Sequence, residues 1–117
     1  MSIKRIKPGP RMSQAVVHNG VVTTAGQVAQ NAAGEDAITQ TKDILKSIDS
    51  LLAEAGTDKS SLLTATIWLS DIQSFNEMNE VWDAWVDKDA APTRACVESK
   101  LASPKFVVEI AVTASVG

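Results

Sequence analysis

The chain has 117 residues, of which 44% are hydrophobic and 21% are charged, and its formal net charge is −3. This length predicts a single domain over residues 1–117, and the acidic balance, with no tyrosine to stack on bases, argues against a nucleic-acid partner. Cys96 is the only cysteine, which excludes an intrachain disulfide, argues against a cysteine-ligated metal site and is typical of a reducing compartment.

The N-terminal segment is basic at Lys4, Arg5 and Lys7 but continues into Pro8-Gly9-Pro10 rather than into an apolar run. Such a start does not match a secretory signal peptide. No segment reaches the roughly 18 apolar residues that cross a bilayer. We therefore expect a cytoplasmic protein without a membrane partner.

Three strands are expected before the first helix. A short strand at 3–6 precedes the Pro-Gly-Pro breaker. Strands at 12–17 and 21–25 flank Asn19-Gly20, a dipeptide that favours a tight hairpin turn. The second strand of this hairpin is expected to end at Gly26-Gln27, before a loop.

The next segment has the periodicity of a helix. Apolar residues recur every three or four positions from Ile38 to Ala55, with charged side chains on the opposite face. Asp36 is the predicted N-cap, and Gly56 is the predicted stop. A long amphipathic helix is therefore expected between them.

A strand and a second helix follow. Residues 62–69 are mostly apolar and β-branched and predict a buried strand. Residues 75–85 have apolar side chains at helical spacing, with Ser74 as the expected N-cap and Glu77 at the capping-box position.

The chain ends in two further strands, at 93–98 after Pro92 and at 106–114. The expected order is β-β-β-α-β-α-β-β, an α+β fold with two helices on one face of a mixed sheet. Two helices cannot cover both faces of that sheet. We therefore expect another subunit to cover the second face.

Arg94 is the residue most in need of a chemical explanation. Alternation divides its strand into one face with Arg94, Cys96 and Glu98 and another with Thr93, Ala95 and Val97, of which the second is expected under the helices. An arginine on a covered face is costly unless it meets an anion, and its planar fork matches a carboxylate. Two alternatives stay open: an internal pair with Glu98 or Glu109, and a carboxylate-binding site.

Glu109 interrupts an otherwise apolar strand. A carboxylate there either pairs with Arg94 or, with a pKa raised by burial, serves as a general acid or base, and the two roles are compatible. Arg94 lies two residues from Cys96 and could lower the pKa of its thiol. The only histidine, His18, is expected in the hairpin, so a Cys-His nucleophile pair has little support. No phosphate loop or metal-ligand cluster is visible, and no cofactor is expected.

Six segments spread over nearly the whole chain form a recognisable set. They are Gln14, 24–27, 66–71, 75–79, 91–98 and 105–110. The most specific feature is Pro92-Thr93-Arg94-Ala95-Cys96 with a glutamate fifteen residues after the arginine. The set resembles the Rid family, the reactive intermediate deaminases, which are also called the YjgF or L-PSP ribonuclease family.

This resemblance implies a chorismate-mutase-like fold with a six-stranded sheet, assembled as a homotrimer with pockets between subunits. It also implies hydrolysis of small 2-imino or enamine acids, such as 2-aminoacrylate, to 2-keto acids and ammonia without a metal. By the same resemblance Arg94 would hold the substrate carboxylate, and Glu109 would position or activate water. Cys96 would line the site through its backbone, and Gly26 and Asn79 would line the same pocket.

Two positions depart from the best-known deaminase branch of that family. Met12 stands where that branch has a tyrosine, and Ala25 stands where it has a hydroxyl residue. Both groups touch substrate or water there, so their loss implies either a changed substrate or a loss of deamination, and the chain is assigned to another Rid subgroup whose substrate the sequence does not identify. Arg11 brings an additional charge near the pocket mouth.

Two other functions compete with deamination. A non-catalytic protein that binds small carboxylates would need only Arg94, and the missing hydroxyls favour it. A ribonuclease or translation inhibitor is suggested by the family name. The net charge and the lack of an acid–base pair such as two histidines argue against this third function.

Overall fold

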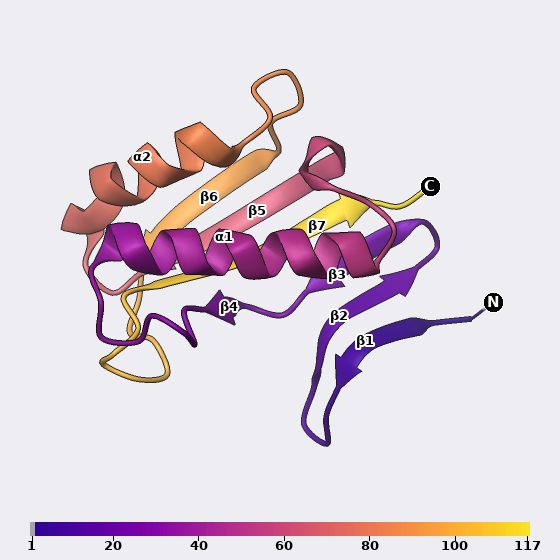
Figure 1. Ribbon diagram of the computed structural model, residues 1–117, viewed down its shortest axis with the longest axis horizontal. Helices are drawn as coiled ribbons and strands as arrows, with labels where there is room; N and C mark the ends of the chain where they lie inside the picture. The colour runs from indigo at the N-terminus through magenta and orange to yellow at the C-terminus, as the bar shows by residue number, and fades with distance from the viewer. Residues whose placement is uncertain (1) are drawn as a thin grey trace.

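Two helices pack on one face of a mixed β-sheet in the computed structural model, which describes residues 2–117 (Figure 1). The elements are β1 (Lys4–Pro8), β2 (Ser13–His18), β3 (Val21–Thr24), β4 (Gln27–Val28), α1 (Ala37–Glu54), β5 (Leu62–Leu69), α2 (Phe75–Trp85), β6 (Thr93–Glu98) and β7 (Val108–Ser115). Short 3-10 turns at Lys59–Ser61 and Ile72–Ser74 precede β5 and α2. The predicted α+β class, with two helices and a mixed sheet, is confirmed.

The strands follow the spatial order β1-β2-β3-β7-β5-β6. Only β5 and β6 run parallel among the paired strands of residues 2–117, and the other pairs are antiparallel. β7 therefore lies in the middle of the sheet, between β3 and β5, although it comes after both in the sequence. β6 forms one edge, beneath α2 (Figure 1).

The predicted β2–β3 hairpin is confirmed. Asn19 and Gly20 have φ angles of 52° and 76°, the two consecutive positive values that a type I′ turn requires. The first helix also begins and ends as expected. The Asp36 side chain accepts a hydrogen bond of 2.8 Å from the Thr39 N–H, and Gly56 follows the helix with a φ of 86°.

Two local expectations are wrong. Ser74 makes no side-chain capping hydrogen bond, because its φ and ψ of −78° and 1° continue a 3-10 turn into α2 instead of extending the chain. Asp71 caps that turn by accepting from the Gln73 N–H at 2.9 Å. The sheet also contains the short strand β4, at the position where the second strand of the hairpin is expected to end. β4 pairs with β7. A strand of two residues is too short to show a period in sequence.

The hydrophobic core lies between the sheet and the helices. On β7 it is formed by Val108, Ile110, Val112 and Ala114, which are all buried. The alternate residues of β5, β6 and β7 line the opposite side, which we call the open face: Thr64, Thr66, Trp68, Thr93, Ala95, Val97, Glu109, Ala111 and Thr113. The open face is thus a mixture of threonines, small residues and two larger apolar side chains.

β6 presents its faces in the reverse of the expected orientation. Arg94 and Cys96 lie under α2 and are half-buried, whereas Ala95 and Val97 are exposed on the open face. The reason is the aromatic surface of α2, which accepts the guanidinium of Arg94 and leaves room for a small thiol. On an edge strand, apolar content alone does not identify the covered face.

Candidate functional site

Arg94 lies against three side chains of α2. Its Nη1 donates a hydrogen bond of 2.7 Å to Asn79 Oδ1, and its Cζ lies 5.3 Å from the Trp82 ring centroid and 5.8 Å from that of Phe75. Positions 75, 79 and 82 share one face of a helix because they are spaced four and three residues apart. α2 therefore forms a platform that holds the guanidinium by cation–π contacts and one hydrogen bond.

Neither internal ion pair expected for Arg94 is present. Glu98 accepts a hydrogen bond of 2.9 Å from the Ile72 N–H, and Glu109 lies on the other face of the sheet. A guanidinium has five N–H donors, and the partners of Arg94 within residues 2–117 are Asn79 and, at 4.0 Å, the Met78 sulfur. Most of its fork is free for an external anion.

Glu109 stands at the centre of the open face. Val28 of β4 and Trp68 of β5 are its paired neighbours on either side. Burial raises the pKa of the Glu109 carboxyl above its ordinary value. A carboxyl group in this state exchanges protons nearer to neutral pH than a solvated glutamate does.

The Glu109 side chain leaves no room for a side chain at position 26, which is occupied by glycine. A Cβ at Gly26 would overlap the Glu109 carboxylate, with Cδ at 2.8 Å and Cγ at 3.1 Å. Only a residue without a side chain permits this close approach. The turn that follows β3 is thereby brought directly against the carboxylate.

Cys96 is half-buried at the edge of the core. Burial raises the pKa of its thiol, and this effect outweighs the attraction of Arg94, which acts in the opposite direction. Arg94 acts on this pKa in the expected direction, but burial decides the net shift, which is upward. A thiol that stays protonated is a poor nucleophile.

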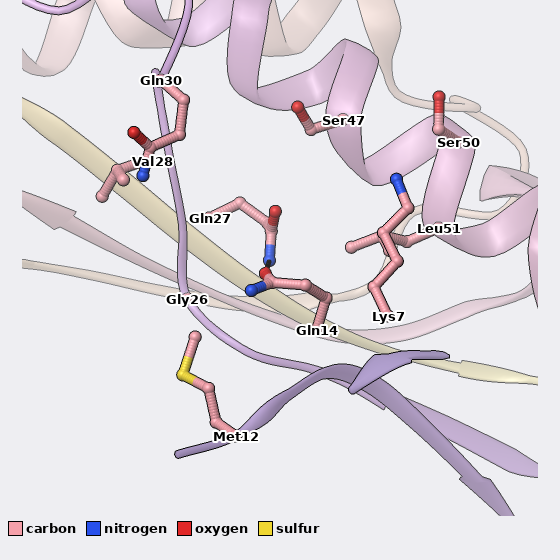
Figure 2. Close-up of a pocket in the computed structure, with 10 residues that line it drawn as sticks. All are labelled: Lys7, Met12, Gln14, Gly26, Gln27, Val28, Gln30, Ser47, Ser50 and Leu51. Carbon is pink, nitrogen blue, oxygen red and sulfur yellow. Dashed lines mark hydrogen bonds between the residues drawn. The ribbon is translucent and has the colours of Figure 1, made fainter. Parts of the chain in front are cut away.

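Met12 and Gly26 line one end of a cavity of about 360 Å³, and residues of α1 line the other end (Figure 2). Met12 is 49% exposed. The Ala25 N–H donates to the Gln14 carbonyl at 2.8 Å. The Gln27 side chain donates to Gln14 Oε1 at 3.0 Å and to the Ala25 carbonyl at 3.1 Å, which fixes this turn.

The expected site residues form two groups in one chain rather than one. Arg94, Asn79 and Cys96 lie on the helix side of the sheet at its β6 edge. Glu109 and Gly26 meet on the open face. The first group can bind an anion, and the second can exchange a proton with water. Neither can do both.

Two features of these groups are missing from the sequence-based description. The sequence pattern gives Phe75 and Trp82 only as apolar positions of the second helix, yet both rings contact the guanidinium of Arg94. Their spacing with Asn79 is the signal that could have identified this platform. Gln27 is expected only at the end of a strand, and nothing in the sequence indicates its hydrogen bond to Gln14.

Within residues 2–117 no group of three or more histidine, cysteine, aspartate or glutamate side chains could hold a metal ion. In the same part of the chain, neither helix is long and apolar enough to span a bilayer.

Comparison with known proteins gives a consistent result along the whole chain. The family model described as Endoribonuclease L-PSP matches residues 2–116. A RutC family protein of Haemophilus influenzae is 44% identical over 115 residues, which are 98% of this chain and 99% of the relative. The RutC family protein YoaB of Escherichia coli is 43% identical over 116 residues, which are 99% of this chain and 100% of the relative. The crystal structure of a YjgF family member from Neisseria meningitidis is 47% identical, has a TM-score of 0.96, and the alignment covers 100% of this chain and 97% of that one.

Proposed function

The chain belongs to the endoribonuclease L-PSP family, also called the YjgF or Rid family, and we propose that it hydrolyses small 2-imino or enamine acids to 2-keto acids and ammonia. The observation that carries this proposal is the free fork of Arg94. A half-buried guanidinium on an aromatic platform, without an internal carboxylate, is suited to hold the carboxylate of a small acid.

We further propose that the working site lies between two subunits of a homotrimer. Arg94 and Glu109 occupy opposite faces of the sheet, so one substrate can reach both only if they come from different chains. The open face gives a reason for such packing, since Trp68 and Val97 lie on it without a helix to cover them. Sedimentation equilibrium should give about three times the chain mass of 12.4 kDa.

The reaction needs little more than these groups. With the carboxylate held on Arg94, the electrophilic C=N carbon is presented to a water molecule beside Glu109 of the neighbouring subunit. Glu109 accepts a proton from the water as the C–O bond forms, and the imine nitrogen takes up a proton from solvent as the C=N π bond breaks. In the carbinolamine, protonated Glu109 gives its proton to the amino nitrogen, the C–N bond breaks and ammonia leaves. The hydroxyl releases its proton to solvent as it becomes the carbonyl, and Glu109 is again ionised. The raised pKa of Glu109 suits both proton transfers.

Mixing two inactive variants tests the proposal directly. Arg94→Ala and Glu109→Gln are co-expressed, and hybrid trimers are assayed for ammonia release from imines made in situ by an amino-acid oxidase. If each site takes one residue from each of two chains, random hybrids regain up to about a quarter of the wild-type sites. Hybrids no more active than either parent, in correctly assembled trimers, contradict a shared site. A wild type that leaves the spontaneous rate of imine hydrolysis unchanged contradicts the activity.

A non-catalytic role as a binder of small carboxylates is the second candidate. Met12 and Ala25 favour it, because neither side chain offers a hydroxyl near Gly26 and Glu109. This function needs the Arg94 platform but not Glu109. It predicts that pyruvate binds with equal affinity to the wild type and to Glu109→Gln, while neither protein accelerates imine hydrolysis.

A further inference from the structure

The cavity shown in Figure 2 has an end that the proposed chemistry does not use. Its walls come from the β1–β2 hairpin, β4 and α1, and Figure 2 shows Met12 and Gly26 at the end away from α1. At the other end Lys7 extends toward the part of α1 that carries Ser47 and Ser50, and all three residues line the cavity. This second group, which we call the α1 end, has no part in the site built from Arg94 and Glu109.

The backbone at Lys7 is turned so that its side chain points to the α1 end. Alternation along β1 would place Lys7 on the side opposite to the buried Ile6. Lys7 instead has a φ of 48°, in the left-handed region, and its ammonium is directed toward α1 (Figure 2). The other non-glycine residue with positive φ in residues 2–117 is Asn19, where a hairpin turn explains it.

This conformation of Lys7 is unfavourable by local rules. A lysine in the left-handed region costs about 1 kcal/mol, and the following Pro8 favours an extended residue before it. The strand pairing on either side is regular, because Ile6 pairs with Ala15 and Pro8 pairs with Ser13. Strained positions of this kind gather at functional sites. A binding role for the Lys7 ammonium explains why the chain keeps this unfavourable backbone conformation.

The charge of the cavity points to the sign of the ligand. Lys7 is its one charged lining residue among residues 2–117, and the other polar lining groups are glutamine amides and serine hydroxyls. Ser47 and Ser50 are three residues apart, on one face of α1, so both hydroxyls can donate to the same ligand. A positive site is unexpected in a chain of net charge −3.

Hydrogen bonds fix the part of the cavity lining that lies between its two ends. Gln27 is 9% exposed, and its amide is bonded to Gln14 and to the Ala25 carbonyl. Gly26, the residue before Gln27, touches the Glu109 carboxylate. A volume of about 360 Å³ lies within the range of small-molecule pockets, roughly 300–1,000 Å³.

We propose that the α1 end is a second binding site, for a small organic anion whose carboxylate or phosphate group is held by Lys7 and by the hydroxyls of Ser47 and Ser50. The glutamine amides of the cavity bind the neutral polar part of the same molecule. The ligand sits behind the turn that carries Gly26, so its occupancy acts on the position of that turn relative to Glu109.

The test is an NMR titration of the uniformly ¹⁵N-labelled protein with inorganic phosphate, glycerol 3-phosphate and L-lactate. Saturable shifts are expected at the amides of Lys7, Ser47 and Ser50 with at least one probe, and the pattern of responses distinguishes phosphate from carboxylate recognition. Lys7→Met should weaken this binding at least about tenfold, because it removes the one cation that lines the cavity in the described part of the chain. Arg5→Met, an exposed cation on the same strand, serves as the matched control and should change it less than about twofold.

Arg94→Lys separates this site from the interfacial one, because it should leave shifts at the α1 end intact while weakening binding of keto acids elsewhere. Ser47→Leu, which fills the cavity from α1, should abolish the same shifts without unfolding the protein, as a thermal melt would verify. Lack of saturable shifts at these amides up to about 50 mM of every probe overturns the proposal. So does a Lys7→Met dissociation constant within twofold of the wild type.

Discussion

Arg94 and Glu109 are both half-buried charged residues on strands of one sheet, yet their surroundings differ in kind. The aromatic rings and the amide of α2 support the charge of Arg94 while leaving most of its donors free. Glu109 has Val28 and Trp68 as strand neighbours, and burial makes its charged form harder to reach. Arg94 is therefore suited to hold a fixed anion, and Glu109 is suited to transfer a proton.

The largest expected effect comes from Glu109→Gln. Turnover should fall by roughly ten- to a thousandfold, within or just below the range of about 10²–10⁴ for a lost general base, while binding of pyruvate stays the same. Glu98→Gln, a matched carboxamide change on the edge strand β6, should leave turnover close to that of the wild type. Equal turnover in the Glu109 variant and the wild type would remove this residue from the mechanism.

Stability gives the same variant a second readout. Burial raises the folded-state pKa of Glu109 above its unfolded value. The stability contributed by protonated Glu109 is therefore fully present below the unfolded pKa and is lost as pH rises through the folded pKa. At neutral pH the ionised group disfavours folding. The melting temperature of Glu109→Gln should therefore equal or exceed that of the wild type at pH 7. A lower melting temperature would indicate a partner for the charge, and the contrast with Arg94 would fail.

Arg94→Lys should weaken the binding of pyruvate or 2-ketobutyrate by about ten- to a hundredfold, because an ammonium cannot reproduce the bidentate fork. Isothermal titration calorimetry measures this change, with Arg5→Lys as the control on an exposed strand. Equal affinity in Arg94→Lys and the wild type would place the anion site elsewhere.

The pH profile sharpens the assignment of the base. Activity requires ionised Glu109 to accept the proton of water, so kcat/KM should fall by about tenfold per pH unit as pH drops below its pKa. Since burial raises that pKa, the acid limb should begin above the ordinary value of 4.5. Rates measured from pH 4 upward should show this limb in the wild type and lose it in Glu109→Gln. An identical limb in both proteins would belong to another group.

The smallest effect is expected at Cys96, which shares the helix side with Arg94 but contributes no charge. Cys96→Ser should keep most of the turnover, since burial keeps the thiol protonated and water performs the attack. Steady-state assays of the assembled protein, with a melt as the control for folding, check this. A loss beyond about a hundredfold would restore covalent catalysis as an explanation.

Much of this fold can be read from periodicity. The limits of β5, α2 and β6 agree with the prediction residue for residue, because each has a strong pattern between clear breakers. β4 escaped prediction because two residues have no period. The face of β6 was assigned incorrectly because an edge strand takes its covered side from whichever helix packs there, and that choice belongs to tertiary packing.

In the candidate site, too, sequence identifies single residues but not their arrangement, which tertiary packing decides. Arg94 and Glu109 stand out in sequence because each is a charge where an apolar residue is expected. Their separation onto two faces depends on the register of β6, β5 and β7, which pairs Ala65 with Arg94 and Trp68 with Glu109. Chemistry could therefore be predicted from single residues, whereas the division of the site into halves required the sheet.

The position of β7 also has a consequence for the order in which the protein can be assembled on the ribosome. β7 separates β3 from β5 and is translated after both, so the facing edges of these two strands have no partner while the intervening chain is made. The nascent chain must keep two partial sheets apart until the residues from Val108 onward leave the exit tunnel. Unpaired strand edges are templates for wrong pairing. The sheet can therefore be completed only after β7 has left the tunnel, and charged side chains that limit aggregation are most valuable before that point.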